Sequence, residues 1–445
     1  MSSVFYDRIL QSALRQFFER ATLDAEPTPS VSSDAQLAIE PSANPSALVI
    51  RWFGTRYTLR VPGRWAFTAH EVRLARAIGS VLAARYHAIQ NPRIIAERPG
   101  LFSGALEDRY VGAFLDHRPY AIEARVARAD RIASIIELLR VAALSSYENR
   151  PISSGVLLMG AADEAARAGT GVTATSSDVE TLSRIKSFFR LADGVHTVFL
   201  ASREGLLLDV VDIERWGAEQ SREQRLQVPC AKAFQPHALA TAQRGHVCVV
   251  LSPSREIKVF AEGAELFVFR GAAWHLLDVQ AKYRIWAEAV GVDSLASRIF
   301  QTARDLAEAR EGALFLVARE PERAVAELVA PADYLDGSTA SSTEASSPTR
   351  RELLQLLEGR TITSLDPSVL AALASLDGAT VTDRSGRLLA AGAILRHTPE
   401  HLGQGALIEG ARTTAAMAAS QFGPVLKVSE DGVITFFDRE RVWDI

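Results

Sequence analysis

The sequence predicts an α/β (α+β) fold in which mixed β-sheets are flanked by helices. Helical and strand-like segments alternate over the last two thirds of the chain, which is typical of sheets covered by helices. The hydrophobic fraction of 48% is that of a core-forming globular protein, and 445 residues exceed the usual size of one domain. One pattern of segments occurs twice in the same order, so we expect two related domains in tandem.

The first 46 residues are expected to form a helix and a linker. Apolar side chains between Phe5 and Phe18 recur at helical spacing, while charged residues interrupt the run, which predicts a docking helix rather than a signal peptide. Residues 24–46 are rich in Pro, Ser and Ala and are typical of a linker. A second polar stretch, 336–349, predicts a mobile loop.

Residues 47–128 are expected to form a small α+β domain, with a hairpin over 46–63 and an amphipathic helix over 69–88. A second strong helix is predicted from 129 to about 146. Strand-like runs follow it: GVLLMG, VHTVFLA, LLLDVVDI and HVCVVLS. We therefore expect two larger domains, 129–290 and 294–445.

The two larger domains are predicted to be copies of one another. ADGVHTVFLASREGLLLDVVDI (192–213) and LDGATVTDRSGRLLAAGAIL (376–395) each contain Asp-Gly, an apolar strand, a polar turn closed by Gly and a second apolar strand. Upstream, SSGVLLMG and EGALFLVARE each follow a long helix. Downstream, ATAQRGHVCVVLSPSREIKVF is echoed by AASQFGPVLKVSEDGVITFF. Both copies then close on a tryptophan, Trp274 and Trp443. Four matches in one order indicate a duplication.

Three motifs follow one another in the second copy: DGA at 377–379, GARTTAA at 410–416 and VSEDG at 428–432. This ordered set resembles the diadenylate cyclase (DAC) domain family, whose members join two ATP molecules into cyclic di-AMP. That family reads DGA, then GTRHRAA, then SEE with a glycine soon after. The resemblance covers about residues 294–445 and, weakly, the earlier copy.

The resemblance implies a nucleotide site in the second copy. Asp377 matches the aspartate that helps to hold Mg²⁺ or Mn²⁺ and to prime the attacking ribose hydroxyl, and Glu430 would face the same metal. Arg412 matches the first arginine of the phosphate-binding motif, where a guanidinium fork suits phosphate oxygens. The other nucleotide-binding candidates are Gly378, Ala379, Gly410, Thr413, Thr414 and Ser429.

The second copy also departs from the family pattern. Thr413 and Thr414 replace the histidine and the second arginine, and Asp431 replaces the second glutamate. The loss of cationic side chains removes contacts that stabilise charge in phosphoryl transfer, so we expect turnover to suffer more than nucleotide binding. The first copy keeps only Asp193-Gly194, and we expect it to be structural or ligand-sensing.

Each candidate has an ordinary structural interpretation as well. Asp377 can cap a turn, Arg412 can be a solvated surface residue, and residues 430–432 can form a hairpin turn. The spacing of His397 and His401 is one that metals use on helices, but Pro399 lies between them and no third ligand is evident, so zinc is not expected.

Composition narrows the function classes. The net charge of −4 argues against broad binding to nucleic acid, and no run is long and apolar enough to span a bilayer. Two cysteines, Cys230 and Cys248, suit core positions in a bacterial cytoplasmic protein. Two functions stay open: a diadenylate cyclase with an N-terminal sensor region, or an inactive nucleotide sensor or signalling scaffold. A cyclase would work as a homo-oligomer with facing DAC-like domains, since each site supplies one ATP.

Overall fold

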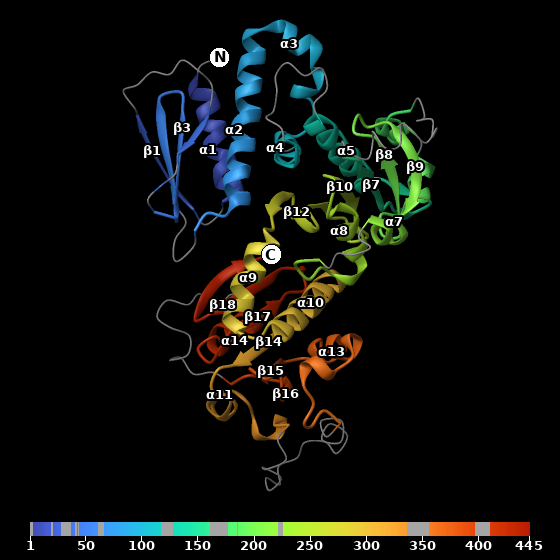
Figure 1. Cartoon of the computed structure of the whole chain (residues 1–445). Helices are drawn as coiled ribbons and strands as arrows, with labels where there is room; N and C mark the ends of the chain where they lie inside the picture. Colours follow the sequence, from blue (N-terminus) through green and yellow to red (C-terminus); the bar gives the residue numbers. More distant parts are fainter. Residues whose placement is uncertain are drawn as a thin grey trace. The chain divides into compact units, whose positions relative to one another are not determined.

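Figure 1 shows a computed structural model of the chain, which divides into two compact units. The first unit comprises Met1–Arg225 and Pro236–Asp278, and the second comprises Leu226–Gln235 and Val279–Ile445. The structure describes residues 3–18, 21–27, 37–40, 42, 44–60, 66–116, 128–160, 177–184, 186–220, 226–335, 356–396 and 410–445. The predicted loop at 336–349 and the pair His397 and His401 lie outside these residues.

The first unit begins with a helix packed on a four-stranded antiparallel sheet. Helix α1 (Ser3–Phe17) buries Tyr6 against Trp52, with the ring centroids 6.4 Å apart, which confirms the predicted docking helix. The sheet has the order β1-β4-β3-β2. Its strands are β1 (Thr22–Pro27), β2 (Ala38–Glu40), β3 (Ala47–Trp52) and β4 (Thr55–Arg60).

The linker predicted over 24–46 is contradicted at residues 24–27, which lie in β1, and at residues 38–40, which form β2. Strand β1 runs antiparallel to β4, from Thr22 opposite Arg60 to Pro27 opposite Thr55. Most of its side chains are exposed, so its sequence lacks the apolar alternation that marks a half-buried strand. Backbone pairing rather than side-chain burial holds this strand in place.

In the described residues between the small sheet and the larger one, four α-helices follow one another. They are α2 (Ala69–Gln90), α3 (Pro92–Glu97), α4 (Leu106–Leu115) and α5 (Arg128–Ala143), of which α2 and α5 confirm the two predicted helices. A capping box starts α2: the Thr68 hydroxyl accepts a bond from the Glu71 N–H at 3.1 Å, and the Glu71 carboxylate accepts one from the Thr68 N–H at 2.8 Å.

The larger sheet of the first unit has seven strands in the order β13-β12-β11-β10-β7-β8-β9. These strands are β7 (Ser154–Leu158), β8 (Thr197–Ala201), β9 (Leu207–Asp212), β10 (Val247–Leu251), β11 (Ile257–Ala261), β12 (Ala264–Arg270) and β13 (Ala273–Leu276). The shorter elements here are β5 (Ser146–Tyr147), β6 (Arg150–Pro151), α7 (Ile213–Gln220) and α8 (Gln235–Thr241).

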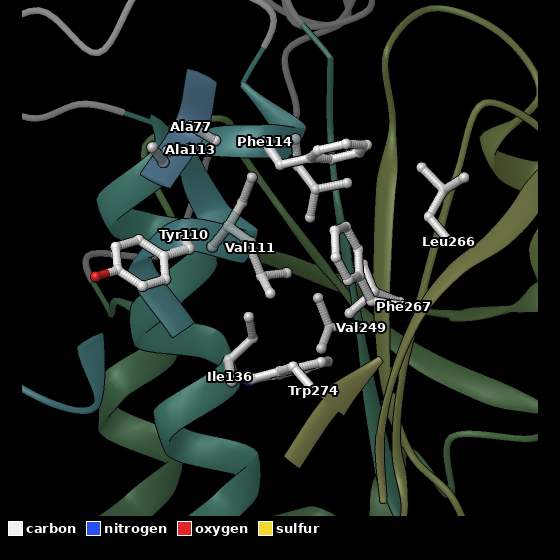
Figure 2. Close-up of a cluster of buried hydrophobic side chains, with 14 of the residues drawn as sticks. Ala77, Tyr110, Val111, Ala113, Phe114, Ile136, Val249, Leu266, Phe267 and Trp274 are labelled. Carbon is white, nitrogen blue, oxygen red and sulfur yellow. The ribbon is translucent and has the colours of Figure 1, made fainter. Parts of the chain in front are cut away.

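One hydrophobic core joins the small sheet, the helices and the larger sheet of the first unit. Figure 2 shows part of it, where Phe114 of α4 meets Phe267 of β12 edge to face with ring centroids 4.9 Å apart. Trp52 of the small sheet belongs to the same core. Residues 47–128 and most of 129–290, expected as separate domains, therefore lie in one unit.

The second unit is a six-stranded mixed sheet flanked by helices, in the order β16-β15-β14-β17-β18-β19. Its strands are β14 (Ala313–Ala318), β15 (Ala379–Asp383), β16 (Leu388–Ala393), β17 (Val425–Val428), β18 (Ile434–Asp438) and β19 (Glu440–Asp444). Its helices include α9 (Val279–Val290), α10 (Asp293–Ala309), α11 (Pro321–Leu328), α13 (Pro367–Ala374) and α14 (Ala411–Ala419). Trp286 of α9 is fully buried against Phe436, so this unit starts before residue 294.

The two larger sheets share one topology, as the internal repeat predicted. Strands β7, β8, β9, β10, β11 and β12 correspond in order to β14, β15, β16, β17, β18 and β19. In each sheet the first of these strands pairs in parallel with the second and antiparallel with the fourth. Helices α5 and α10 precede the first strand, and α8 and α14 precede the fourth. The predicted α/β fold with mixed sheets flanked by helices is confirmed.

Two smaller expectations can also be compared with the structure. Cys230 and Cys248 are both buried, as expected for core residues. In the part of the chain that the structure describes, no helix combines the length and the apolar character needed to cross a membrane.

A charged cluster in the first unit forms around His70 at the start of α2. His70 Nδ1 lies 2.9 Å from Asp278 Oδ1, and His70 Nε2 lies 3.5 Å from Glu262 Oε2. The hydrogen bond to Asp278 raises the pKa of His70 to about 9, and the bond from His70 lowers the pKa of Glu262 to about 2. His70 is therefore protonated at neutral pH and bridges two carboxylates.

We expect His70→Gln to flatten the pH dependence of unfolding between about pH 6.5 and pH 9. Because the folded-state pKa is raised, the His70 contribution is complete below the unfolded-state pKa and is lost as pH rises through the folded-state pKa. For this mostly buried side chain the loss amounts to about 1–3 kcal/mol. Urea unfolding at a series of pH values measures it, with His87→Gln in the same helix as the control. Parallel profiles for wild type and His70→Gln would contradict the prediction.

Candidate functional site

The sheet of the second unit brings the predicted motifs to one edge. Strand β14 runs parallel to β15 and antiparallel to β17, with Ala313 opposite Val428. The first residues of β14 and β15 and the last residue of β17 therefore lie on the same edge. Continued by one residue, the register sets Gly312 beside Ser429.

Asp377 reaches this edge through the register of β15. Thr380 pairs with Phe315, so three residues earlier Asp377 is level with Gly312. The Asp377 side chain is exposed and makes no hydrogen bond to any of the described residues. Its carboxylate is thus open to solvent beside the start of the central strand.

Gly378 fixes the backbone where β15 begins. Its φ of 113° is one that residues with a side chain rarely adopt, and a Cβ there would lie 2.6–2.7 Å from backbone atoms of Gly392 and Ala393 on β16. Ala379, the next residue, is buried as the first residue of the strand. The DGA sequence therefore turns tightly into the sheet and leaves Asp377 outside it.

The N-terminus of α14 lies over the same edge. Gly410 is its N-cap, with φ of 113° and no side chain to cap the first backbone N–H groups. The guanidinium of Arg412 occupies the space that a Cβ on Gly312 would fill, and its Nη1 lies 3.5 Å from Glu430 Oε1. Thr414 directs its hydroxyl to the Gly410 carbonyl at 3.0 Å. Arg412 and Glu430 are therefore brought together, as the motif order requires.

Thr413 makes a different contact. Its hydroxyl accepts a hydrogen bond from Lys427 Nζ at 3.0 Å, which links the first turn of α14 to β17. The sequence prediction assigned no role to Lys427. The feature of the sequence that could have indicated a role is that Lys427 is the one charged residue in the otherwise apolar strand VLKV.

The residues after β17 form a tight turn. The Ser429 N–H donates to the Val433 carbonyl at 2.9 Å, and the Asp431 carboxylate accepts a bond from the Val433 N–H at 3.0 Å. The Glu430 side chain is 75% exposed, which leaves its carboxylate accessible although it pairs with Arg412. The hairpin-turn interpretation of this motif is correct, and the turn also presents Glu430 at the edge.

The structure joins the candidates only in part. Contacts link Arg412 to Glu430, while register alone brings Asp377 and Gly378 to the same edge. Gly312 is a further residue that sequence reasoning missed. Only its position directly before a buried strand could have suggested that it leaves room for another side chain.

At the corresponding edge of the first copy, the carboxylate of Asp193 already has hydrogen-bond partners within the chain. Asp193 Oδ1 accepts bonds from the backbone N–H groups of Val195, His196 and Thr197 at 2.8, 2.7 and 3.1 Å, and Oδ2 lies 2.8 Å from His196 Nδ1. Although burial opposes the shift, these bonds lower the pKa of Asp193 to about 2.

A buried histidine forms a further hydrogen bond at this edge of the first copy. His237 of α8, the helix that corresponds to α14, is fully buried and donates from Nε2 to the Gly194 carbonyl at 2.8 Å. Burial lowers the pKa of His237 to about 4, so this side chain is neutral at neutral pH. Among the described residues of the first copy, the carboxylate at this edge is therefore already held by backbone N–H groups and by His196.

The exposed carboxylates of the second copy, Asp377 and Glu430, suit a metal ion that is also bound by phosphate oxygens of a ligand. Among the described residues, no group of three or more His, Cys, Asp and Glu side chains could hold a metal ion. Mg²⁺ is commonly held by one or two carboxylates together with phosphate oxygens and water. The carboxylates of Asp377 and Glu430 suit that arrangement.

A scan against protein-family models finds no match for this chain, and a search of curated proteins finds none either. Among solved structures, the chain is similar to one described as the hypothetical membrane spanning protein from Bacillus cereus, from structural genomics. The identity is 19%, the similarity covers 37% of this chain and 70% of that chain, and the TM-score is 0.26. The assignment of the candidate site therefore rests on its own geometry.

We expect Asp193→Ala to lower the stability of the first unit by about 1 kcal/mol, because three backbone N–H groups lose their acceptor. The matched change Asp377→Ala should leave stability within about 0.5 kcal/mol of wild type, as is usual for a surface position. Chemical denaturation of both variants measures the difference. Equal destabilisation by the two changes would refute the contrast between a closed edge and an open one.

Proposed function

We propose that the second unit binds ATP or a related nucleotide as a DAC-like domain. One observation carries the proposal: Asp377, the α14 N-terminus with Arg412, and the turn with Glu430 all lie at one sheet edge. These are the three segments through which the sequence resembles that family. Their meeting at one edge is what a shared nucleotide site requires.

Each segment has a physical role in this proposal. The Arg412 guanidinium is a planar donor suited to phosphate oxygens, and the uncapped N–H groups of α14 add further donors. Gly378 and Ala379 carry little bulk, so a nucleotide can approach the backbone closely. The hydroxyls of Thr414 and Ser429 supply additional polar contacts at the same edge.

Cyclase activity forms a bond between the ribose hydroxyl oxygen of one ATP and the α-phosphorus of the other, with loss of pyrophosphate. Mg²⁺ or Mn²⁺, held by Asp377, Glu430 and phosphate oxygens, would neutralise phosphate charge and acidify the hydroxyl. The exposed Asp377 carboxylate would orient that hydroxyl. Because the first copy is closed at Asp193 and His237, we infer that the facing site belongs to a second chain, in a homo-oligomer.

The alternative is a nucleotide sensor or signalling scaffold without catalysis. The contacts of Thr413 and Thr414 favour it, since these residues stand in place of two cationic residues and already bond to Lys427 and to the Gly410 carbonyl. In either case we assign the first unit a sensor role and place the protein in the bacterial cytoplasm. Nucleic acid and membrane are not among the proposed partners.

Incubation of the protein with ATP and Mg²⁺ or Mn²⁺, followed by chromatography for cyclic di-AMP, tests the proposal. We expect product to form with a rate that is second order in protein at low concentration. Asp377→Asn should abolish product while ATP still binds, and Arg412→Ala should weaken ATP binding by about 1–3 kcal/mol. Binding without product in the wild type would favour the sensor. Equal ATP binding by wild type and Arg412→Ala, with no product with either metal, would exclude the cyclase and favour the signalling scaffold.

Metal binding should depend on the nucleotide. We expect the protein alone to bind Mn²⁺ weakly, because the described residues offer no group of three ligands, and ATP to increase the bound Mn²⁺. Glu430→Gln should reduce that increase, whereas Glu440→Gln on β19 should not. Electron paramagnetic resonance of free Mn²⁺ measures the bound fraction. Tight Mn²⁺ binding without nucleotide would contradict this prediction.

A further inference from the structure

Lys427 lies where a cation is unexpected. It is the only charged residue of β17, and its Nζ donates to the Thr413 hydroxyl at 3.0 Å in the first turn of α14. The N-terminus of a helix carries partial positive charge and normally favours Asp or Glu. A lysine directed toward this end of the helix therefore lies against the electrostatic preference of the helix.

Three positive features converge at this point: the Lys427 ammonium, the Arg412 guanidinium and the N-terminal N–H groups of α14. The first turn of α14 contains no acidic residue. The Glu430 carboxylate near Arg412 is mostly exposed at a distance of 3.5 Å, and such surface pairs contribute little. A phosphate group bound between these positive groups can accept hydrogen bonds from all of them.

The register of the sheet places these groups on one face. Lys427 is directly opposite Leu314, and Ala313 is opposite Val428, so the next position sets Gly312 opposite Ser429. Opposed residues of antiparallel strands, and residues two apart, project from the same face. The face covered by α14 therefore carries both Lys427 and Ser429. It also contains the space above Gly312, which the Arg412 guanidinium fills.

We propose that Lys427 is a phosphate-binding residue of this site and supplies the positive charge that Thr413 and Thr414 do not. The inference rests on the proposed nucleotide function and names a cation from β17 in place of the missing pair on α14. Thr413 holds the Lys427 ammonium toward the helix N-terminus. The ligand group recognised is the polyphosphate, not the base or the ribose.

Isothermal titration calorimetry tests this role. It measures the affinities of Lys427 variants for adenosine, AMP, ADP and ATP. Lys427→Gln keeps a donor for Thr413 but removes the charge, Lys427→Met removes both, and Lys427→Arg keeps the charge. We expect the Gln and Met variants to lose about tenfold in ATP affinity, as for one charge-assisted contact, with adenosine affinity unchanged. Lys427→Arg should bind ATP nearly as wild type does.

Lys282→Met is the matched control, since Lys282 is the other lysine of this unit with a hydrogen bond to a strand, donating to the Asp444 carbonyl at 2.8 Å on β19. It should bind ATP as the wild type does. ATP binding by Lys427→Gln equal to wild type, with Arg412→Ala weakened, would overturn the Lys427 role and leave the proposed function intact. Equal losses for ATP and adenosine would also overturn it, by indicating a structural role. Absence of ATP binding in the wild type would reject the proposed function itself.

Discussion

The candidate site depends on how the central strand β14 is paired. All of its residues are buried, and it pairs in parallel with β15 on one side and antiparallel with β17 on the other. Its own start is therefore flanked by the start of one neighbour and the end of the other. Gly312 lies just before that start, and the absence of a side chain there gives the Arg412 guanidinium its place. A residue with a side chain at 312 would displace the guanidinium.

The same pairing occurs in both copies, but the edge is used differently. In the first copy, the Asp193 carboxylate accepts hydrogen bonds from backbone N–H groups, and the neutral His237 donates a hydrogen bond to the Gly194 carbonyl. In the second copy, Asp377 is open and the helix start carries positive charge without an acidic residue in its first turn. A carboxylate whose hydrogen bonds are satisfied by its own backbone contributes to stability, whereas an exposed carboxylate remains available to a ligand of the proposed kind. The difference lies in a few side chains on an unchanged backbone topology.

The main helices and the strand order of the two larger sheets could be predicted from the sequence. Helices α2 and α5 have long apolar stripes, and the repeated order of segments predicted the shared strand order of the two sheets. Strand β1 was missed because its mostly exposed side chains carry no alternating signal, and β2 was missed because it has only three residues. Gly312 and Lys427 were missed for another reason: their roles come from neighbours distant in the chain, Arg412 and Thr413, and only the register brings these together.

The closed first copy also bears on how a DAC-like function would be carried out. A reaction between two nucleotides needs two sites that each present a carboxylate and phosphate-binding cations. In the proposal only the second unit provides such a site, because at the corresponding edge of the first copy the carboxylate of Asp193 already accepts backbone hydrogen bonds. If the second unit joins nucleotides as proposed, the tandem duplication within one chain does not supply the facing site, and association between chains must provide it.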